Sequence, residues 1–227
     1  MAATKFTRRA EPSGWLTVKL SSSHRPIALC EYTKVELTRQ QGGLTYFNVA
    51  DGNSDFVGQE AYLHDNNVAL YLSDTGPRGA ASVMVRYVGE PAWETSPFKG
   101  RLLQQWADET FNGITARVTL NSIWNRDFTP IPPGTHAILA PDRSHGNIST
   151  AGYVSAAAGM HGNDVWFPIG LNGAATPSGR YIHVGHLSEG CITQHDLSQW
   201  SAIYDYLISS REPGSLGKRV GRVVVKK

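Results

Sequence analysis

Cysteine is scarce in this chain of 227 residues, which has two cysteines, Cys30 and Cys191, and only three methionines. A small secreted domain held by disulfides would carry more cysteines, so the sequence does not indicate a disulfide scaffold. An excess of one charge is also missing, because 21 Lys and Arg stand against 19 Asp and Glu, a net charge of +2. This balance disfavours a dedicated nucleic-acid-binding protein, which needs basic residues to neutralise phosphates.

Long hydrophobic runs are absent too. No window approaches the roughly 18 consecutive apolar residues of a membrane helix, so we expect no membrane span. Residues 1–13 are polar and charged and lack the apolar centre of a secretory signal. We therefore expect a product made in the cytoplasm, with both cysteines as free thiols.

What the chain does contain is glycine (23), proline (12) and short alternating apolar runs, a pattern typical of β structure. The fold expected is mainly β. We expect a flexible leader over residues 1–13, an antiparallel β module of unknown role over 14–112, and a second β-rich domain over 113–227. The runs that predict strands are 15–20, 32–37, 44–49, 68–72, 82–88, 115–120, 135–139, 181–184 and 220–225, and residues 165–169 are apolar.

Two segments predict helices. Residues 102–111 carry apolar side chains on roughly one side, as in a short helix. Residues 196–210 give the stronger pattern, because Leu197, Trp200, Ile203 and Tyr204 begin a stripe with the period of a helix. Asp196 is suited to cap its first turn.

The segment with chemical potential surrounds Cys191. We expect a strand over 181–184, a tight loop over 185–190, and a helix just after the cysteine. A helix N-terminus lowers the pKa of a nearby thiol, and His183 or His186 is close enough in sequence to activate it. The N–H groups of Gly190 and Cys191 are suited to stabilise an oxyanion.

Other interpretations remain open for these residues. A lone cysteine is often a buried small hydrophobic residue, which is the simplest interpretation of Cys30. A zinc site built from His183, His186, Cys191 and His195 is a weaker alternative, because the second cysteine of a zinc-binding pair is missing. We therefore expect no metal and no organic cofactor.

The run Ile182-His183 followed by Ser188-Glu189-Gly190-Cys191-Ile192-Thr193 resembles the active-site signature of the L,D-transpeptidase (YkuD-like) family. The resemblance is strongest to a short-loop branch that includes antibacterial effectors of type VI secretion systems. The segment Pro130-Ile131-Pro132-Pro133-Gly134-Thr135 is similar to the one that opens the catalytic domain of those proteins. The resemblance spans about residues 115–227, and it makes this second domain the expected catalytic one.

The resemblance implies roles for individual residues. Cys191 would be the nucleophile and His183 the general base, oriented by the carbonyl of Val184. Ser188 and Gly190 would shape the oxyanion loop. The substrate-binding residues would be Arg180, His186 and Thr193, with Arg180 holding a substrate carboxylate through paired N–H bonds. Glu189 and Thr193 differ from the residues usual at their positions in the family.

The function implied is acyl transfer on peptidoglycan stem peptides, as an L,D-transpeptidase, an L,D-carboxypeptidase or a D-amino-acid exchange enzyme. An effector of this kind would act in the periplasm or cell wall and would have an immunity protein and a secretion carrier as partners. Two alternatives stay open: a cysteine peptidase on another peptide, and a non-catalytic component of a phage tail or secretion apparatus.

Overall fold

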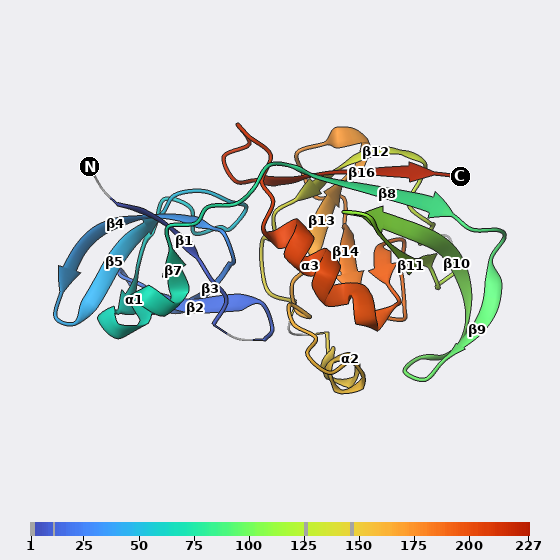
Figure 1. The fold of residues 1–227 in the computed structure, drawn as a ribbon, viewed down its shortest axis with the longest axis horizontal. Coiled ribbons are helices and arrows are strands. Elements are labelled where there is room, and N and C mark those ends of the chain that lie inside the picture. Colours follow the sequence, from blue (N-terminus) through green and yellow to red (C-terminus); the bar gives the residue numbers. More distant parts are fainter. Residues whose placement is uncertain (1–2, 11, 125–126, 146–147) are drawn as a thin grey trace.

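The computed structural model describes residues 3–10, 12–124, 127–145 and 148–227, and it consists of two β lobes side by side (Figure 1). The expectation of a mainly β fold is confirmed. Residues 1, 2 and 11 of the expected leader lie outside the described residues. The described part of the leader is not wholly irregular, because Thr4–Thr7 forms strand β1, which pairs with two other strands.

The first lobe is a sheet of seven strands. They are β1 (Thr4–Thr7), β2 (Trp15–Leu20), β3 (Pro26–Cys30), β4 (Lys34–Gln41), β5 (Leu44–Val49), β6 (Glu60–His64) and β7 (Leu72–Ser73). Their order is β3-β2-β6-β5-β4-β1-β7, and each pairing is antiparallel. Alternation in β2 and β5 buries one face of the sheet over a core that includes Val35, Phe47 and Val49. An antiparallel N-terminal module is therefore confirmed.

The second lobe contains the other nine strands of the described residues. They are β8 (Ala81–Tyr87), β9 (Ala92–Ser96), β10 (Gly100–Phe111), β11 (Ile114–Asn121), β12 (Gly134–Leu139), β13 (Phe167–Gly170), β14 (Arg180–Val184), β15 (Ile192–Gln194) and β16 (Arg219–Lys226). Their order is β11-β15-β14-β13-β12-β16-β8-β10-β9, and β11 also pairs with β10. That extra pairing closes all of these strands except β9 into a barrel.

Two pairings in the barrel are parallel. The C-terminal strand β16 lies between β12 and β8 and runs parallel to β8. Strands β14 and β15 are also parallel, although only the short segment 185–191 joins them. The first pairing joins β16 to the strands that follow the first lobe, and the second builds the site described below.

The described helices are few. They are α1 (Asp65–Tyr71), α2 (Ala151–Ala156), α3 (Trp200–Ile208) and the single 3-10 turns η1 (Leu171–Gly173) and η2 (Leu197–Gln199). Helix α3 confirms the expected helix after Cys191, and its buried stripe packs into the core of the barrel lobe. Asp196 accepts a hydrogen bond from the Ser198 N–H at the start of η2.

Two expected elements are wrong in type. Residues 102–111 belong to strand β10 rather than to a helix, and residues 68–71 belong to helix α1 rather than to a strand. Over so short a segment, the apolar positions of β10 are compatible with the period of a helix as well as with that of a strand. Pairing with β8, β9 and β11 decides in favour of the strand.

The boundary between the lobes also differs from the expected one. Strands β8, β9 and β10 pair within the barrel sheet, so the sheets divide between Ser73 and Ala81 rather than at residue 112. Sequence patterns mark strands but do not say which sheet each strand joins. The segment 81–112 is therefore predicted in the first lobe, although its strands belong to the second.

The lobes are joined through Glu31, which is 6% exposed. Its carboxylate accepts hydrogen bonds from Tyr204 of α3 (2.9 Å) and from Arg9 (2.9 Å). Its backbone carbonyl accepts one from the buried Arg211 (3.0 Å). Trp15 of the first sheet also belongs to the hydrophobic core of the barrel lobe.

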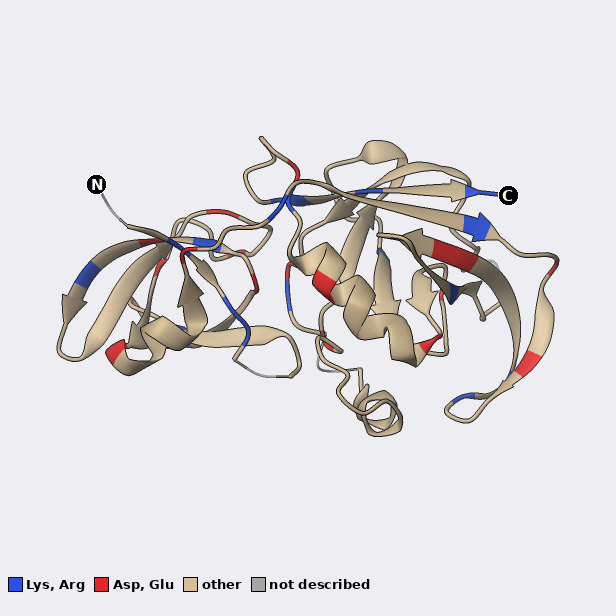
Figure 2. Ribbon diagram, viewed as in Figure 1, with Lys and Arg blue, Asp and Glu red and all other residues tan. Residues whose placement is uncertain are grey.

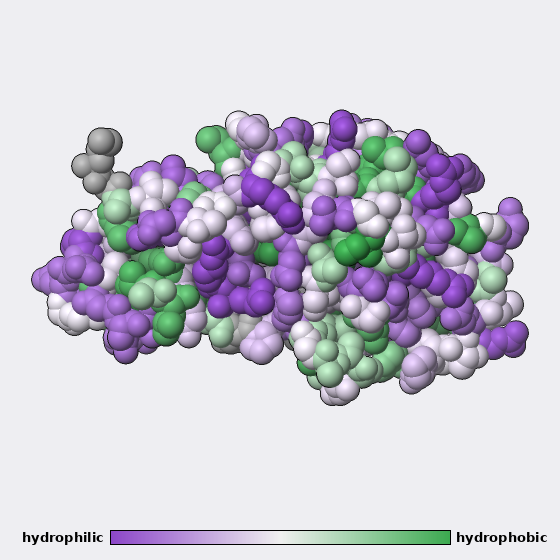
Figure 3. Space-filling model, in the orientation of Figure 1, coloured by the Kyte–Doolittle hydropathy of each residue, from purple (hydrophilic) through white to green (hydrophobic). Residues whose placement is uncertain are grey.

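The surface carries both signs of charge on both lobes, without a face of one sign in the view of Figure 2. Figure 3 shows that the same face is largely polar, with a weakly apolar area over α2. No helix in the described ranges is long and apolar enough to cross a membrane.

Candidate active site

The parallel strands β14 and β15 place the candidate residues on one face. Ile182 lies opposite Ile192 and His183 opposite Thr193, so the apolar residues of both strands enter the barrel core. Because side chains alternate along a strand, Tyr181, His183 and Thr193 share the opposite face with Cys191, the residue before β15. The fold thereby brings together the base and the nucleophile expected from the sequence.

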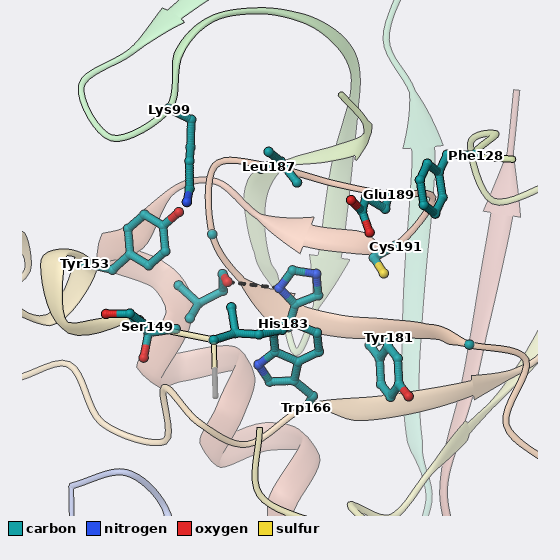
Figure 4. Close-up of a pocket in the computed structure, with 15 residues that line it drawn as sticks. Lys99, Phe128, Ser149, Tyr153, Trp166, Tyr181, His183, Leu187, Glu189 and Cys191 are labelled. Carbon is teal, nitrogen blue, oxygen red and sulfur yellow. Dashed lines mark hydrogen bonds between the residues drawn. The ribbon is translucent and has the colours of Figure 1, made fainter. Parts of the chain in front are cut away.

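Cys191 and His183 line one cavity of about 350 Å³. The loop 185–191, helix α2 and the turn between β9 and β10 also contribute to its wall. Figure 4 shows the sulfur of Cys191 pointing into the cavity on the side where the His183 ring lies. No hydrogen bond joins the sulfur to His183 in the described part of the chain.

Two hydrogen bonds fix the His183 imidazole. Nδ1 lies 2.9 Å from the carbonyl oxygen of Val184, the contact that the family resemblance implies. A carbonyl only accepts, so Nδ1 carries the proton and Nε2 is an acceptor. Nε2 receives a hydrogen bond from the Thr193 hydroxyl at 3.1 Å. The nitrogen that a general base would use is therefore oriented but occupied.

An aromatic stack supports the same imidazole. The His183 ring lies 4.1 Å from the Trp166 ring at an interplanar angle of 13°. His145 stacks on Trp166 at 4.5 Å and 7°. Burial lowers the pKa of His183 to about 4, although its bond to Val184 acts in the opposite direction. The imidazole is therefore neutral at pH 7.

The helix expected directly after Cys191 is not found there. Strand β15 follows it, and the first helical turn begins at Leu197. Without a helix dipole, burial dominates and raises the pKa of the Cys191 thiol to about 11. Backbone hydrogen bonds from Tyr181 and Glu189 and the charge of Arg180 act in the opposite direction. The structure therefore contains a neutral thiol beside a neutral imidazole.

Ser188 organises the loop before Cys191. Its hydroxyl accepts a hydrogen bond from the Cys191 N–H and lies 3.1 Å from the Cys191 carbonyl oxygen, to which it donates. The Cys191 N–H is thus not free for an oxyanion in this conformation. Among the described residues, no group accepts a hydrogen bond from the Gly190 N–H. Gly190 is therefore the expected oxyanion donor that stays available.

Arg180 holds the loop from the other side. Its Nη1 donates to the carbonyl oxygens of Gly190 and Thr129, both at 2.6 Å. Gly190 has φ +81°, and a Cβ at this position would collide with the Arg180 guanidinium and the Thr129 carbonyl. The sequence analysis gave Arg180 a substrate carboxylate as its partner. In the structure its hydrogen bonds go to the chain itself.

The other expected substrate-binding residues lie away from the cavity surface. His186 is 6% exposed, contacts Ser96 through Nδ1 at 2.9 Å and stacks on His195 at 3.7 Å. Thr193 is fully buried under His183. His186 therefore supports the turn between β9 and β10, and Thr193 supports the imidazole.

A hydrogen-bonded set of polar side chains behind the loop is not among the residues predicted from the sequence. Ser122 accepts a hydrogen bond from the Ser188 N–H (2.9 Å) and donates to Oε1 of Gln104 (2.5 Å). Nε2 of Gln104 donates to the carbonyl of His186 (3.2 Å). The available signal was a set of polar residues at inward positions of β10 and β11, which an apolar strand core would not contain.

The arrangement of side chains in the described residues includes no group of three or more His, Cys, Asp or Glu placed to hold a metal ion. A comparison of the chain with protein-family models, curated proteins and solved structures finds no significant match.

Proposed function

We propose that this protein is a cysteine-dependent acyltransferase or hydrolase that acts on peptides. The observation that carries the proposal is that Cys191 and His183 line one cavity, with the imidazole oriented by the Val184 carbonyl. A nucleophile, a base and a group that orients the base are the parts that catalysis through a thioester requires.

The proposed reaction begins with proton transfer from the Cys191 thiol to Nε2 of His183, after the Thr193 hydroxyl has turned away. The sulfur then bonds to the substrate carbonyl carbon, with the Gly190 N–H beside the developing oxyanion. The C–N bond breaks, and the leaving amine takes the proton from His183. Water or a second amine next attacks the thioester carbonyl carbon while His183 takes its proton. The C–S bond breaks, and the Cys191 sulfur regains a proton from His183. The products are a free acid or a new amide.

The substrate class that we propose is the peptidoglycan stem peptide, cut or exchanged at an L,D bond. Support comes from the resemblance of the segments 130–135 and 182–193 to the YkuD-like family, and from the cavity beside the nucleophile. The place of action would then be the periplasm or cell wall. The effector role, with an immunity protein and a secretion carrier, is part of the same proposal.

Purified protein incubated with tetrapeptide muropeptides tests the proposal. Mass spectrometry should detect release of D-alanine, new crosslinks or exchange of the terminal residue. Cys191→Ala should lose all three, whereas Cys30→Ala, which changes a buried thiol outside the cavity, should keep them. Expression in a bacterial periplasm should be toxic only with Cys191 present. Turnover that persists in Cys191→Ala contradicts the proposal.

One observation favours a second candidate, a non-catalytic binding role. The Cys191 N–H and His183 Nε2, two groups that catalysis would use, are already hydrogen-bonded within the chain. In that case no muropeptide would be converted and no peptide thioester would form at Cys191. Thioester formation with peptides other than muropeptides would instead indicate a cysteine peptidase.

A further inference from the structure

Two hydrogen-bond donors from different elements meet at the α2 end of the cavity. Lys99, an exposed side chain, comes from the turn between β9 and β10, and Tyr153 comes from α2. Figure 4 shows the Lys99 ammonium group and the Tyr153 hydroxyl pointing toward one another, whereas the Trp166 indole lies apart from them, below the His183 ring. Cys191 lies on the opposite side.

These donors lack acceptors within the described residues. The Tyr153 oxygen accepts a hydrogen bond from the His186 N–H at 3.2 Å, which leaves its own proton free to donate. Lys99 forms no ion pair with any described residue. A buried donor without an acceptor costs free energy, and a ligand that supplies acceptors removes this cost.

The surrounding structure holds the donors in place. The Lys99 N–H donates to Ser96 Oγ at 3.2 Å, and Ser96 Oγ contacts His186 Nδ1 at 2.9 Å. Phe98 packs edge-on against the Tyr153 ring with centroids 4.8 Å apart. The turn that carries Lys99 is thus fastened to α2 and to the loop before Cys191.

The charges of the cavity wall are separated along its length. Glu189 supplies the carboxylate of the described lining residues, and Figure 4 shows it beside Cys191 rather than beside Lys99. The α2 end therefore has donors and a positive charge without an acidic side chain to neutralise them. A neighbouring ammonium group and hydroxyl donor match the lone pairs of a carboxylate.

We propose that the α2 end of the cavity is a carboxylate-binding subsite formed by Lys99 and Tyr153. It would hold a carboxylate of a peptide whose acyl carbon lies at Cys191. The identity of the peptide rests on the proposed function, whereas the subsite itself does not. This assignment gives Lys99 the role that the sequence analysis gave to Arg180.

Affinity labelling of the full chain tests the subsite without requiring catalysis. The probes are N-iodoacetyl derivatives of glycine, β-alanine, 4-aminobutyrate and 6-aminohexanoate, each compared with its neutral methylamide. Alkylation of Cys191 is followed by mass spectrometry. We expect one chain length to label roughly tenfold faster as the acid than as the amide, the ratio that a charge-assisted hydrogen bond provides.

Substitutions identify the residues that cause the faster labelling by the acid. Lys99→Gln should abolish the preference for the acid, Tyr153→Phe should reduce it, and Lys99→Arg should retain it. Lys226→Gln, at an exposed lysine of β16 outside the cavity lining, should leave it unchanged. Equal labelling by acid and amide at every length, or a preference that survives Lys99→Gln, overturns the subsite.

Tetrapeptides separate the inference from the proposed function and identify the carboxylate. Tetrapeptides amidated either at the C-terminus or at a side-chain carboxylate are compared with the free acid. Only one of these amidations should lower turnover, and Lys99→Gln should remove the difference between that amide and the free acid. Labelling that depends on Lys99 without any peptide turnover would leave the subsite standing and remove the proposed function. Peptide turnover that Lys99→Gln does not affect would support the proposed function and overturn the subsite.

Discussion

At the scale of single residues, the central fact is that Cys191 and His183 are both uncharged at neutral pH. Burial sets both protonation states, raising the pKa of the thiol to about 11 and lowering that of the imidazole to about 4. A preformed thiolate–imidazolium pair is therefore disfavoured. In the proposed reaction the thiol therefore has to pass its proton to His183 at the start of each cycle, because it does not rest as a thiolate.

This state predicts the pH dependence of the site. Alkylation of Cys191 by iodoacetamide follows the thiolate fraction, so its rate should rise about tenfold per unit between pH 7 and 10. Acyl transfer needs neutral His183, so activity should fall as the pH drops through about 4. A rate of alkylation that is already constant below pH 8 would contradict the account.

Glu109 on β10 predicts a second pH effect. It is fully buried, neither of its carboxylate oxygens has a hydrogen-bond partner among the described residues, and burial raises its pKa to about 8. Between pH 4.5 and 8 the folded chain keeps this proton while the unfolded chain releases it, so stability should fall as the pH rises through this range.

Glu109→Gln should remove this dependence. At about 1.4 kcal/mol per pKa unit, the free energy of unfolding of the variant should gain up to about 4 kcal/mol on that of the wild type between pH 4.5 and 8. Urea unfolding at several pH values measures the gain. Asp108→Asn, at the exposed neighbour, is the control. Parallel pH profiles of wild type and Glu109→Gln would show that Glu109 is not the cause.

At the scale of elements, the site is made by two parallel strands and the loop that joins them. The loop begins after Val184 and is held at Ser188 by Ser122 and at Gly190 by Arg180. The sequence allowed the strand 181–184 and the loop after it to be predicted, and it pointed to Cys191 as a candidate residue of the site. It did not show that the next element is strand β15, because three residues are too few to give a periodic pattern.

Gly190→Ala tests the loop. Its φ of +81° strains an L-residue, and the new Cβ would displace Arg180 from the Gly190 carbonyl. We expect acyl transfer to fall at least tenfold, with little change in the midpoint of thermal unfolding. Gly179→Ala is the matched control, because its φ is +77° and the space around it is open. Equal losses in both variants would assign the effect to backbone strain alone.

At the scale of the whole molecule, buried polar groups connect the two separate sheets. Arg211, which is 8% exposed, donates to the carbonyls of Ile208, Ser210 and Glu31. Sequence patterns located most strands of both lobes but not this junction, because its partners lie about 180 residues apart in the chain. For the same reason the lobe boundary was predicted too far along the chain.

Arg211→Met should destabilise the protein by about 3 kcal/mol, because three buried carbonyls lose their donor while much of the side-chain volume stays. Chemical denaturation followed by tryptophan fluorescence measures the change. Arg222→Met, at an exposed position of β16, should change stability little. If both variants unfold at the same denaturant concentration, Arg211 does not hold the lobes together.

The position of β16 also has a consequence for synthesis. The first sheet uses strands from residues 4–73 alone, so it can form while the ribosome is still making the rest of the chain. The barrel cannot, because β8 and β12 keep open edges until β16, which ends at Lys226, has emerged to lie between them. A nascent chain therefore carries a folded first lobe well before it has a complete barrel around Cys191. The surroundings of Cys191 are therefore completed only once residue 226 has left the ribosome.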